Sequence, residues 1–409
     1  MTAQVGILNS EVAVLASDTA GSSYYGKSVK IFKSIKKIHK LADNLPVAIM
    51  VYGSARLSSV LWSRVIDLFK KQLGGEEKNK LKDYLDGFIN FIENNSELTN
   101  YERNIDFFIS WAKKIYINLE DMAYKNGDLN EVKFKFWINE ENEELKRIEK
   151  SVLDDSKYNI LVKSFDSYLA NISSINYVKH PRLLKRFRDE IKEYLTLLFV
   201  KSITNTFESG VVIAGFGKDD IYPSLINVYI EGLFENKLRM AEPKYYMIGE
   251  DYLDKTKSTA RIIPFAQADG VTLFMEGFAP EIKNFVLETS RNNTDEILSF
   301  LQNHNLFNGL SKEKRLKILN DLNLYSDRQF KEYTNNIGRY TYSNYTDPIV
   351  NSVSQMGTGD LAELARTLVN LTSIKRRYSM NQEETVGGEI NVVILSKADG
   401  YIEVNKKSE

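Results

Sequence analysis

The chain of 409 residues carries 54 basic and 55 acidic side chains, a formal net charge of -1 at pH 7, and no cysteine. A charge balance this close to zero excludes a strongly basic binder of nucleic acid or of anionic membranes. The absence of cysteine excludes disulfides, thiolate nucleophiles, iron–sulfur clusters and cysteine-ligated zinc. The length corresponds to two or three domains at roughly 150 residues each.

Two short strands are predicted at the start of the chain. Apolar residues occupy alternate positions in 5–7 and 12–16, and Asn9–Glu11 between them is typical of a tight hairpin turn. A polar, glycine-bearing loop is expected to follow from Thr19 to Lys27. The chain is therefore expected to begin with a β-hairpin.

A buried strand and then a helix are predicted next. The nearly continuous apolar run Pro46–Tyr52 predicts a strand that ends at Gly53. Ser54 is a residue type that caps helices, and apolar residues recur at helical spacing across Leu57–Leu68. We therefore expect a helix to begin at Ser54. The helical pattern continues, and 71–180 has the composition of an inserted helical module.

Strand patterns return in the middle of the chain. They cover 210–216, 225–229 and 260–265, and Gly232 is expected to mark a turn. A short helix is predicted around 271–275.

The last part of the chain predicts helices followed by a closing hairpin. The polar stretch 281–335 indicates a second helical insertion. Asp360, with Glu363 three residues later, predicts the start of another helix. A strand at 390–395 and a turn at Asp399–Gly400 complete the pattern. Because strands and helices occur in separate groups, an α+β fold is favoured over alternating βαβ units.

Most familiar catalytic signatures are missing from the chain, which leaves its N-terminus as the place for chemistry. There is no GxSxG, Walker A or GxGxxG motif, and the three histidines lack the HExxH spacing of a metal site. Met1 before a small residue such as Thr2 is normally removed, which frees an α-amine beside the threonine hydroxyl. An amine with a pKa of about 8 can act as general base for that hydroxyl. A nearby lysine would lower the pKa of the amine, and a carboxylate would hold the lysine.

The surroundings of Thr2 resemble the proteasome β-subunit and HslV peptidase family of N-terminal-nucleophile hydrolases, in a bacterial-type form. Members of that family begin at a threonine and have an aspartate at the end of the second strand. Here LASDTA (15–20) has an aspartate at that place, and its spacing from Thr2 matches once Met1 is removed. KKIHKL (36–41) is similar to the family's lysine strand, and PVAIMVYGSA (46–55) to its fourth strand and following turn.

Later segments extend the resemblance to about half of the chain. GFGKDDIYPSLINVYIEG (215–232) resembles the family's middle hairpin, and 360–372, 386–395 and 398–401 are similar to its last helix and closing hairpin. The resemblance implies a four-layer αββα sandwich. In this chain we expect two mainly helical insertions to interrupt it, which is a departure from the family pattern. The expected divisions are a first core part at 1–70, a helical insertion with a returning core helix at 71–200, a core hairpin and helix at 201–280, a second helical insertion at 281–350, and a core helix and hairpin at 351–409.

The resemblance also assigns roles to individual residues. Thr2 would be the nucleophile, with its own amine as base, and Asp18 would orient the lysine. Lys37 would tune the base, with Lys33 as the alternative lysine, and the N–H of Gly53 would donate to the oxyanion. Without the family, Asp18 is equally a turn residue at a strand end, Gly53 a glycine at a helix start, and Lys37 one of five lysines in 30–40.

Three departures from the family pattern support an alternative. Glu383 and Val386 fall where the family has an aspartate and a serine, and Gln267 falls near its mid-chain serine. Valine forms no side-chain hydrogen bond, so Glu384 or Thr385 would have to substitute. The alternative is a catalytically inactive proteasome-like scaffold, or a protein whose helical insertions bind a partner.

The favoured prediction is an N-terminal threonine hydrolase that cleaves amide bonds, most simply peptide bonds, through an acyl-enzyme on Thr2. A peptide or protein substrate and a homo-oligomer are expected, and an ATPase or other protein partner is left open. No cofactor, metal or nucleic acid is expected. Since no run of about 18 apolar residues and no signal peptide are evident, we expect a cytoplasmic protein without membrane contact. Substrate-binding residues are not assigned.

Overall fold

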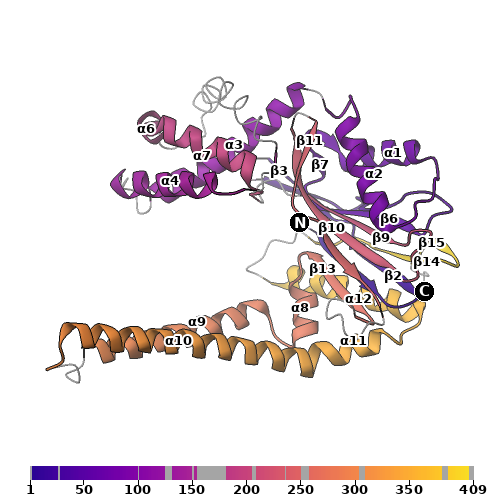
Figure 1. Ribbon diagram of the computed structural model, residues 1–409. Helices are drawn as coiled ribbons and strands as arrows, with labels where there is room; N and C mark the ends of the chain where they lie inside the picture. Colours follow the sequence, from indigo (N-terminus) through magenta and orange to yellow (C-terminus); the bar gives the residue numbers. More distant parts are fainter. Residues whose placement is uncertain are drawn as a thin grey trace. The chain divides into compact units, whose positions relative to one another are not determined.

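The computed structural model describes residues 2–25, 28–99, 101–124, 131–149, 152–153, 181–204, 209–234, 236–249, 258–303, 309–379 and 386–404 (Figure 1). The chain divides into two compact units. The first unit consists of 1–35, 248–394 and 403–409, and the second consists of 36–247 and 395–402. Helices and antiparallel sheets occur together, which confirms the α+β class.

A five-stranded antiparallel sheet carries the N-terminal hairpin, with strand order β13-β1-β2-β14-β15. Its strands are β1 (Ala3–Leu8), β2 (Val12–Asp18), β13 (Arg261–Ala266), β14 (Ile390–Ser396) and β15 (Gly400–Glu403). The predicted turn between β1 and β2 is confirmed, because Asn9 Oδ1 accepts hydrogen bonds from the N–H groups of Glu11 and Val12 at 3.0 Å each. β1 pairs with β13 on one side and with β2 on the other, so it lies inside the sheet.

One face of this sheet is covered by helix α12 (Thr358–Tyr378), which packs on β1 and β2, while α8 (Asp269–Glu276) packs on α12. Leu361, Ala365 and Leu368 recur at helical spacing along the buried side of α12. The expectation that Asp360 caps this helix is wrong. The helix begins at Thr358 after an extended Gly357, so Asp360 lies in the first turn, where the helix dipole favours a negative charge.

The helices predicted in 281–335 are confirmed, and the helical stretch continues beyond this range. It contains α9 (Pro280–Asn303) and α10 (Lys312–Thr341), followed by the π-helix η3 (Tyr342–Thr346) and α11 (Asp347–Val353). α9 and α10 run antiparallel and side by side (Figure 1).

The segment 19–27, expected to be a loop, contains a strand instead, and this strand forms a ribbon with the next one. β3 (Gly21–Tyr25) pairs antiparallel with β4 (Ser28–Phe32). The serines and glycines of this segment suggest a loop, but its tyrosine, valine and isoleucine residues favour strands.

The second unit is built on a six-stranded sheet with order β11-β10-β9-β6-β5, on which β12 pairs with β10. Its strands are β5 (Ile38–Lys40), β6 (Val47–Gly53), β9 (Ser209–Gly215), β10 (Ser224–Phe234), β11 (Lys237–Met240) and β12 (Lys244–Met247). Helices α1 (Trp62–Leu73) and α2 (Leu81–Asn94) share an apolar core with β6, β9 and β10.

Two sequence expectations in this unit are wrong. No helix begins at Ser54: a small ribbon of β7 (Arg56–Leu57) and β8 (Val60–Leu61) comes first, and the Ser54 hydroxyl accepts from the N–H of Arg56 at 3.2 Å. Gly232 does not mark a turn either, because it lies inside β10 where the pairing register shifts. A Cβ at Gly232 would lie 2.5 Å from the ring of Phe107, which explains the glycine.

The helices predicted within 71–200 are confirmed in the described part of that range, whereas 154–180 lies outside the described residues. After α1 and α2, the described helices of this range are α3 (Tyr101–Ala123), α4 (Glu131–Lys146), α6 (Pro181–Arg186) and α7 (Arg188–Lys201). None of the described helices is long and apolar enough to cross a membrane.

A buried polar network ties two of these helices, α3 and α7, to the second sheet. Arg239 Nη2 donates to Glu231 Oε2 at 2.7 Å and to the carbonyl of Ser202 at 2.8 Å, and both ionic side chains are fully buried. Glu231 Oε1 accepts from the hydroxyl of Thr204 at 2.8 Å, and that hydroxyl accepts from the indole N–H of Trp111 at 2.9 Å. The network joins α3 and the end of α7 to β10 and β11.

Candidate active site

Thr2 directly precedes β1 in the first unit and is buried. Its backbone carbonyl accepts a hydrogen bond from the N–H of Gln267 at 3.0 Å, and Gln267 directly follows β13. The next residue, Ala3, is paired with Ala266. The main chain of Thr2 is therefore held at the end of a strand that is fixed by its neighbours.

The carboxylate of Asp18 is fully buried at the end of β2. Its Oδ1 accepts from the N–H of Ala3 at 3.1 Å, and its Oδ2 accepts from the N–H of Gly387 at 3.1 Å. Because both oxygens bind main-chain groups, the orientation of this side chain is fixed. The carboxylate joins the residue after Thr2 to the segment that leads into β14.

Two glycines allow that segment to approach the end of β2. Gly388 has φ 80°, and a Cβ there would lie 2.5 Å from the hydroxyl oxygen of Thr19 and 3.0 Å from the carbonyl oxygen of Lys33. The carbonyl of Gly387 accepts from the N–H of Ala20 at 3.0 Å. A larger residue at position 388 would meet both a strained backbone and a steric clash.

Val386 lies in an apolar environment. It is 1% exposed and belongs to the apolar core that α12 forms with β1 and β2. Its side chain supplies no hydrogen bond. The neighbouring residues Glu383, Glu384 and Thr385 lie outside the described residues.

Lys37 and Gly53 belong to the second unit, where the strands β5 and β6 are paired. Lys37 is 7% exposed and directly precedes β5, and its carbonyl accepts from the N–H of Val51 at 3.0 Å. Lys33, the alternative lysine, belongs to the first unit and is exposed. Within the second unit, the main chain of Lys37 is therefore bonded to β6 two residues before Gly53.

Gly53 ends β6 with φ 77°, a left-handed conformation that glycine adopts without strain. The turn that follows is held by hydrogen bonds of Ser209 on the neighbouring strand β9. Ser209, paired with Gly53, donates from its hydroxyl to the carbonyl of Ser54 at 3.2 Å, and it accepts from the indole N–H of Trp62 at 2.8 Å. The sequence analysis missed Trp62 and Ser209, since no local pattern links residues 147 positions apart.

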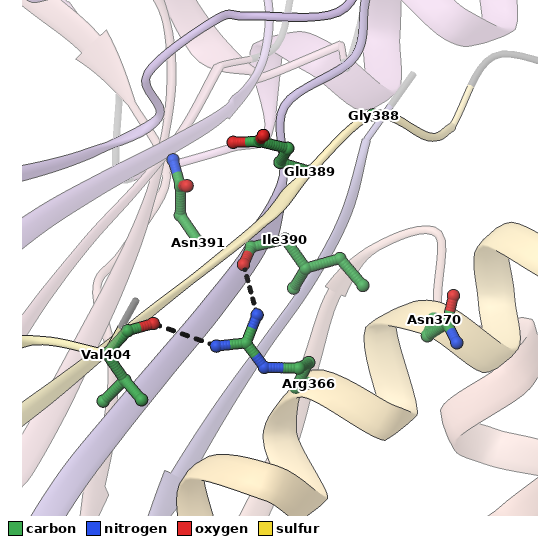
Figure 2. Close-up of a pocket in the computed structure, with 7 residues that line it drawn as sticks. All are labelled: Arg366, Asn370, Gly388, Glu389, Ile390, Asn391 and Val404. Carbon is green, nitrogen blue, oxygen red and sulfur yellow. Dashed lines mark hydrogen bonds between the residues drawn. The ribbon is translucent and has the colours of Figure 1, made fainter. Parts of the chain in front are cut away.

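A pocket of about 610 Å³ lies in the first unit beside the glycine segment (Figure 2). It is lined by Arg366, Asn370, Gly388, Glu389, Ile390, Asn391 and Val404. Arg366 donates from Nη1 to the carbonyl of Ile390 and from Nη2 to the carbonyl of Val404, each at 2.9 Å. These bonds clamp α12 to β14 and to the residue after β15, so the guanidinium stabilises the wall of the pocket.

Among the residues that the structure describes, no group of three or more histidine, aspartate or glutamate side chains is arranged to hold a metal ion. In comparisons with known proteins, no family model and no curated protein matches this chain.

Proposed function

We propose that this chain is a proteasome-like N-terminal threonine hydrolase that cleaves amide bonds, most simply peptide bonds, through an acyl-enzyme on Thr2. The observation that carries the proposal is the buried carboxylate of Asp18, which binds the N–H of Ala3, next to Thr2. The same carboxylate binds Gly387. A nucleophile needs a main chain held in one orientation, and this arrangement supplies it.

The reaction requires that the Met1–Thr2 peptide bond has already been hydrolysed, which removes Met1 and frees the α-amine of Thr2. That amine takes the proton from the threonine hydroxyl as the oxygen attacks the carbonyl carbon of the substrate. The C–N bond then breaks, the ammonium returns the proton to the leaving amine, and an ester on Thr2 remains. Water attacks this ester with the same amine as base, which releases the acid and restores Thr2.

Lys37 and Gly53 take the roles that the family resemblance assigns to them. The lysine ammonium lowers the proton affinity of the α-amine, so that the amine is free to act as base. The N–H of Gly53 donates to the oxyanion of the tetrahedral intermediate. The burial of Lys37 and the positive φ of Gly53 support these roles.

One observation favours the second candidate function, a catalytically inactive scaffold. Val386 is buried among apolar side chains at the place where the family has a serine. A chain that had lost activity would tolerate this change, because no proton would then have to be held near the amine.

Substitution of Thr2 tests the two candidates. Wild type, Thr2→Ala and Thr2→Ser are incubated with a library of fluorogenic peptides, and folding is checked by thermal unfolding. The proposal predicts turnover by wild type, reduced turnover by Thr2→Ser, which keeps a hydroxyl, and a loss of about 10³-fold or more in Thr2→Ala. Unchanged hydrolysis by a folded Thr2→Ala variant would refute it.

A further inference from the structure

The helical hairpin of α9 and α10 exposes many large apolar side chains. The two helices are held antiparallel by the ion pair between Arg291 Nη1 and Asp327 Oδ1 at 2.7 Å and by a hydrogen bond from Arg315 Nη2 to the carbonyl of Gln302 at 2.6 Å. In α10, only Ser326 and Thr341 are buried. Eleven large hydrophobic side chains of the two helices are exposed. So many exposed apolar side chains are unusual on a helical hairpin that binds no partner.

Nine of these eleven side chains lie on one face of the hairpin. Successive residues of a helix are rotated by about 100°. On this spacing, the exposed apolar residues of α9 all lie to one side of the surface that contacts α10. Most of those of α10 lie to the same side of the hairpin. The nine residues, which we name the hairpin face, are Ile282, Phe285, Val286, Ile297, Phe300, Ile318, Tyr325, Tyr333 and Tyr340. Leu316 and Leu324 lie off this face.

The register of the hairpin brings these residues together in layers. The two polar contacts above align the helices so that Phe300 is level with Ile318, and Phe285 is level with Tyr333. Between these layers, α9 presents polar residues on the same flank, the uncharged Thr289 and Asn293 and the acidic Glu296. The hairpin face is therefore two helices wide, with apolar and aromatic layers that are separated by polar side chains.

We propose that the hairpin face binds the hairpin face of a second copy of this chain, with α9 of one copy over α10 of the other. The charges of the helices support this pairing. α9 carries four acidic and two basic residues, whereas α10 carries four acidic and seven basic residues. Placing α9 on α10 joins a net acidic helix to a net basic one, whereas α9 on α9 would stack two acidic helices.

The area of the face also fits a stable dimer. A helix of 24 residues is about 36 Å long, and two helices side by side are about 20 Å wide, so the hairpin face covers about 700 Å². A standard protein interface takes about 800 Å² from each partner. A symmetric dimer uses the same patch twice, so one such face on each chain is sufficient.

Sedimentation of the full chain at concentrations up to about 100 µM tests the proposal. Phe285→Ser with Phe300→Ser removes two side chains that are 68% and 65% exposed, so we expect the variant to fold. Leu316→Ser with Leu324→Ser is the matched control, because these side chains are 59% and 63% exposed but lie off the face. We expect a dimer for wild type and control, and dissociation constants at least about 100-fold weaker for the face variant.

A wild-type chain that stays monomeric at the highest concentration overturns the proposal, as does a face variant that associates as tightly as wild type. Crosslinking then tests the arrangement, since the chain has no cysteine of its own. A chain with Phe285→Cys is mixed with a chain carrying Tyr333→Cys, and a short thiol crosslinker is added. The proposal predicts crosslinked pairs between the two chains. A yield no higher than with Leu324→Cys in place of Tyr333→Cys overturns the pairing of α9 with α10.

Discussion

The N–H of Gly387 donates to Oδ2 of Asp18 at 3.1 Å, which joins residues that are 369 positions apart in the chain. Oδ1 of the same carboxylate accepts from the N–H of Ala3. The start of β1 and the segment before β14 are thus fixed by one side chain. In the proposed enzyme, the position of Thr2 depends on a contact that forms only when the two ends of the chain have folded together.

Asp18→Asn is expected to weaken both folding and hydrolysis. The NH2 group of asparagine cannot accept a hydrogen bond, so one of the two main-chain N–H groups loses its acceptor. A buried donor is then unsatisfied, which lowers the free energy of unfolding by about 2–3 kcal/mol. Urea unfolding measures this cost, and kcat/KM is expected to fall by roughly 10²-fold. Asp399→Asn is the control, because that exposed carboxylate bonds only locally, to Ser396, among the described contacts. Full hydrolysis by Asp18→Asn would show that this carboxylate is structural alone.

Lys37→Met and Lys33→Met decide which lysine serves the proposed base. Lys37 is buried, whereas Lys33 is exposed. Methionine keeps the length of the side chain and removes its charge, so Lys37→Met is expected to fold and to lose roughly 10²-fold or more in kcat. Lys33→Met is expected to stay within about threefold of wild type. The reverse order of kcat values would transfer the role to Lys33.

Ser209→Ala tests whether the hydrogen bonds of Ser209 position the turn after Gly53. The variant removes the acceptor of the Trp62 indole N–H and the donor to the Ser54 carbonyl, which costs about 1–3 kcal/mol of stability. We expect kcat to fall while KM changes little, because an oxyanion donor acts in the transition state. Thr196→Ala removes a buried hydroxyl in α7 and serves as control. An equal loss of kcat in both variants would mean a general effect of stability.

Stability is expected to decrease at mildly acidic pH, in part through His39. Burial lowers the pKa of His39 below its ordinary value of 6.5, and the ammonium of Lys36 lowers it further, while Asp67 acts in the opposite direction. The unfolded chain therefore binds more protons than the folded chain below about pH 6.5, so the free energy of unfolding falls as pH decreases. His39→Gln is expected to lose less stability than wild type between about pH 7.5 and about pH 5.5. Equal losses would contradict this effect.

The strands around the candidate site could be predicted where local patterns were strong. The hairpin of β1 and β2 follows from alternation around the turn at Asn9, and β6 follows from an unbroken apolar run. The ribbon of β3 and β4 was missed because its polar residues obscure the strand pattern. The sequence predicts a helix start at Ser54, because this capping residue comes before apolar residues at helical spacing. The first of these apolar residues belong to two short strands, β7 and β8, so α1 begins later.

Contacts between distant residues could not be derived from the sequence. The residue types at Thr2 and Asp18 suggest chemistry, but no spacing rule predicts that Asp18 binds Gly387. The bond from Trp62 to Ser209 is of the same kind. The hairpin face was also missed, because residues 281–335 have a polar composition and only the helical register gathers their apolar side chains on one side.

The most direct test of the account is the intact mass of the native protein after incubation with an electrophilic probe for N-terminal threonine, combined with N-terminal sequencing. The account predicts that Met1 is absent and that one probe molecule is bound at Thr2, and that Thr2→Ala binds none. Retention of Met1 on essentially all molecules would leave Thr2 without its base and contradict the proposed mechanism. Equal labelling of wild type and Thr2→Ala would do the same.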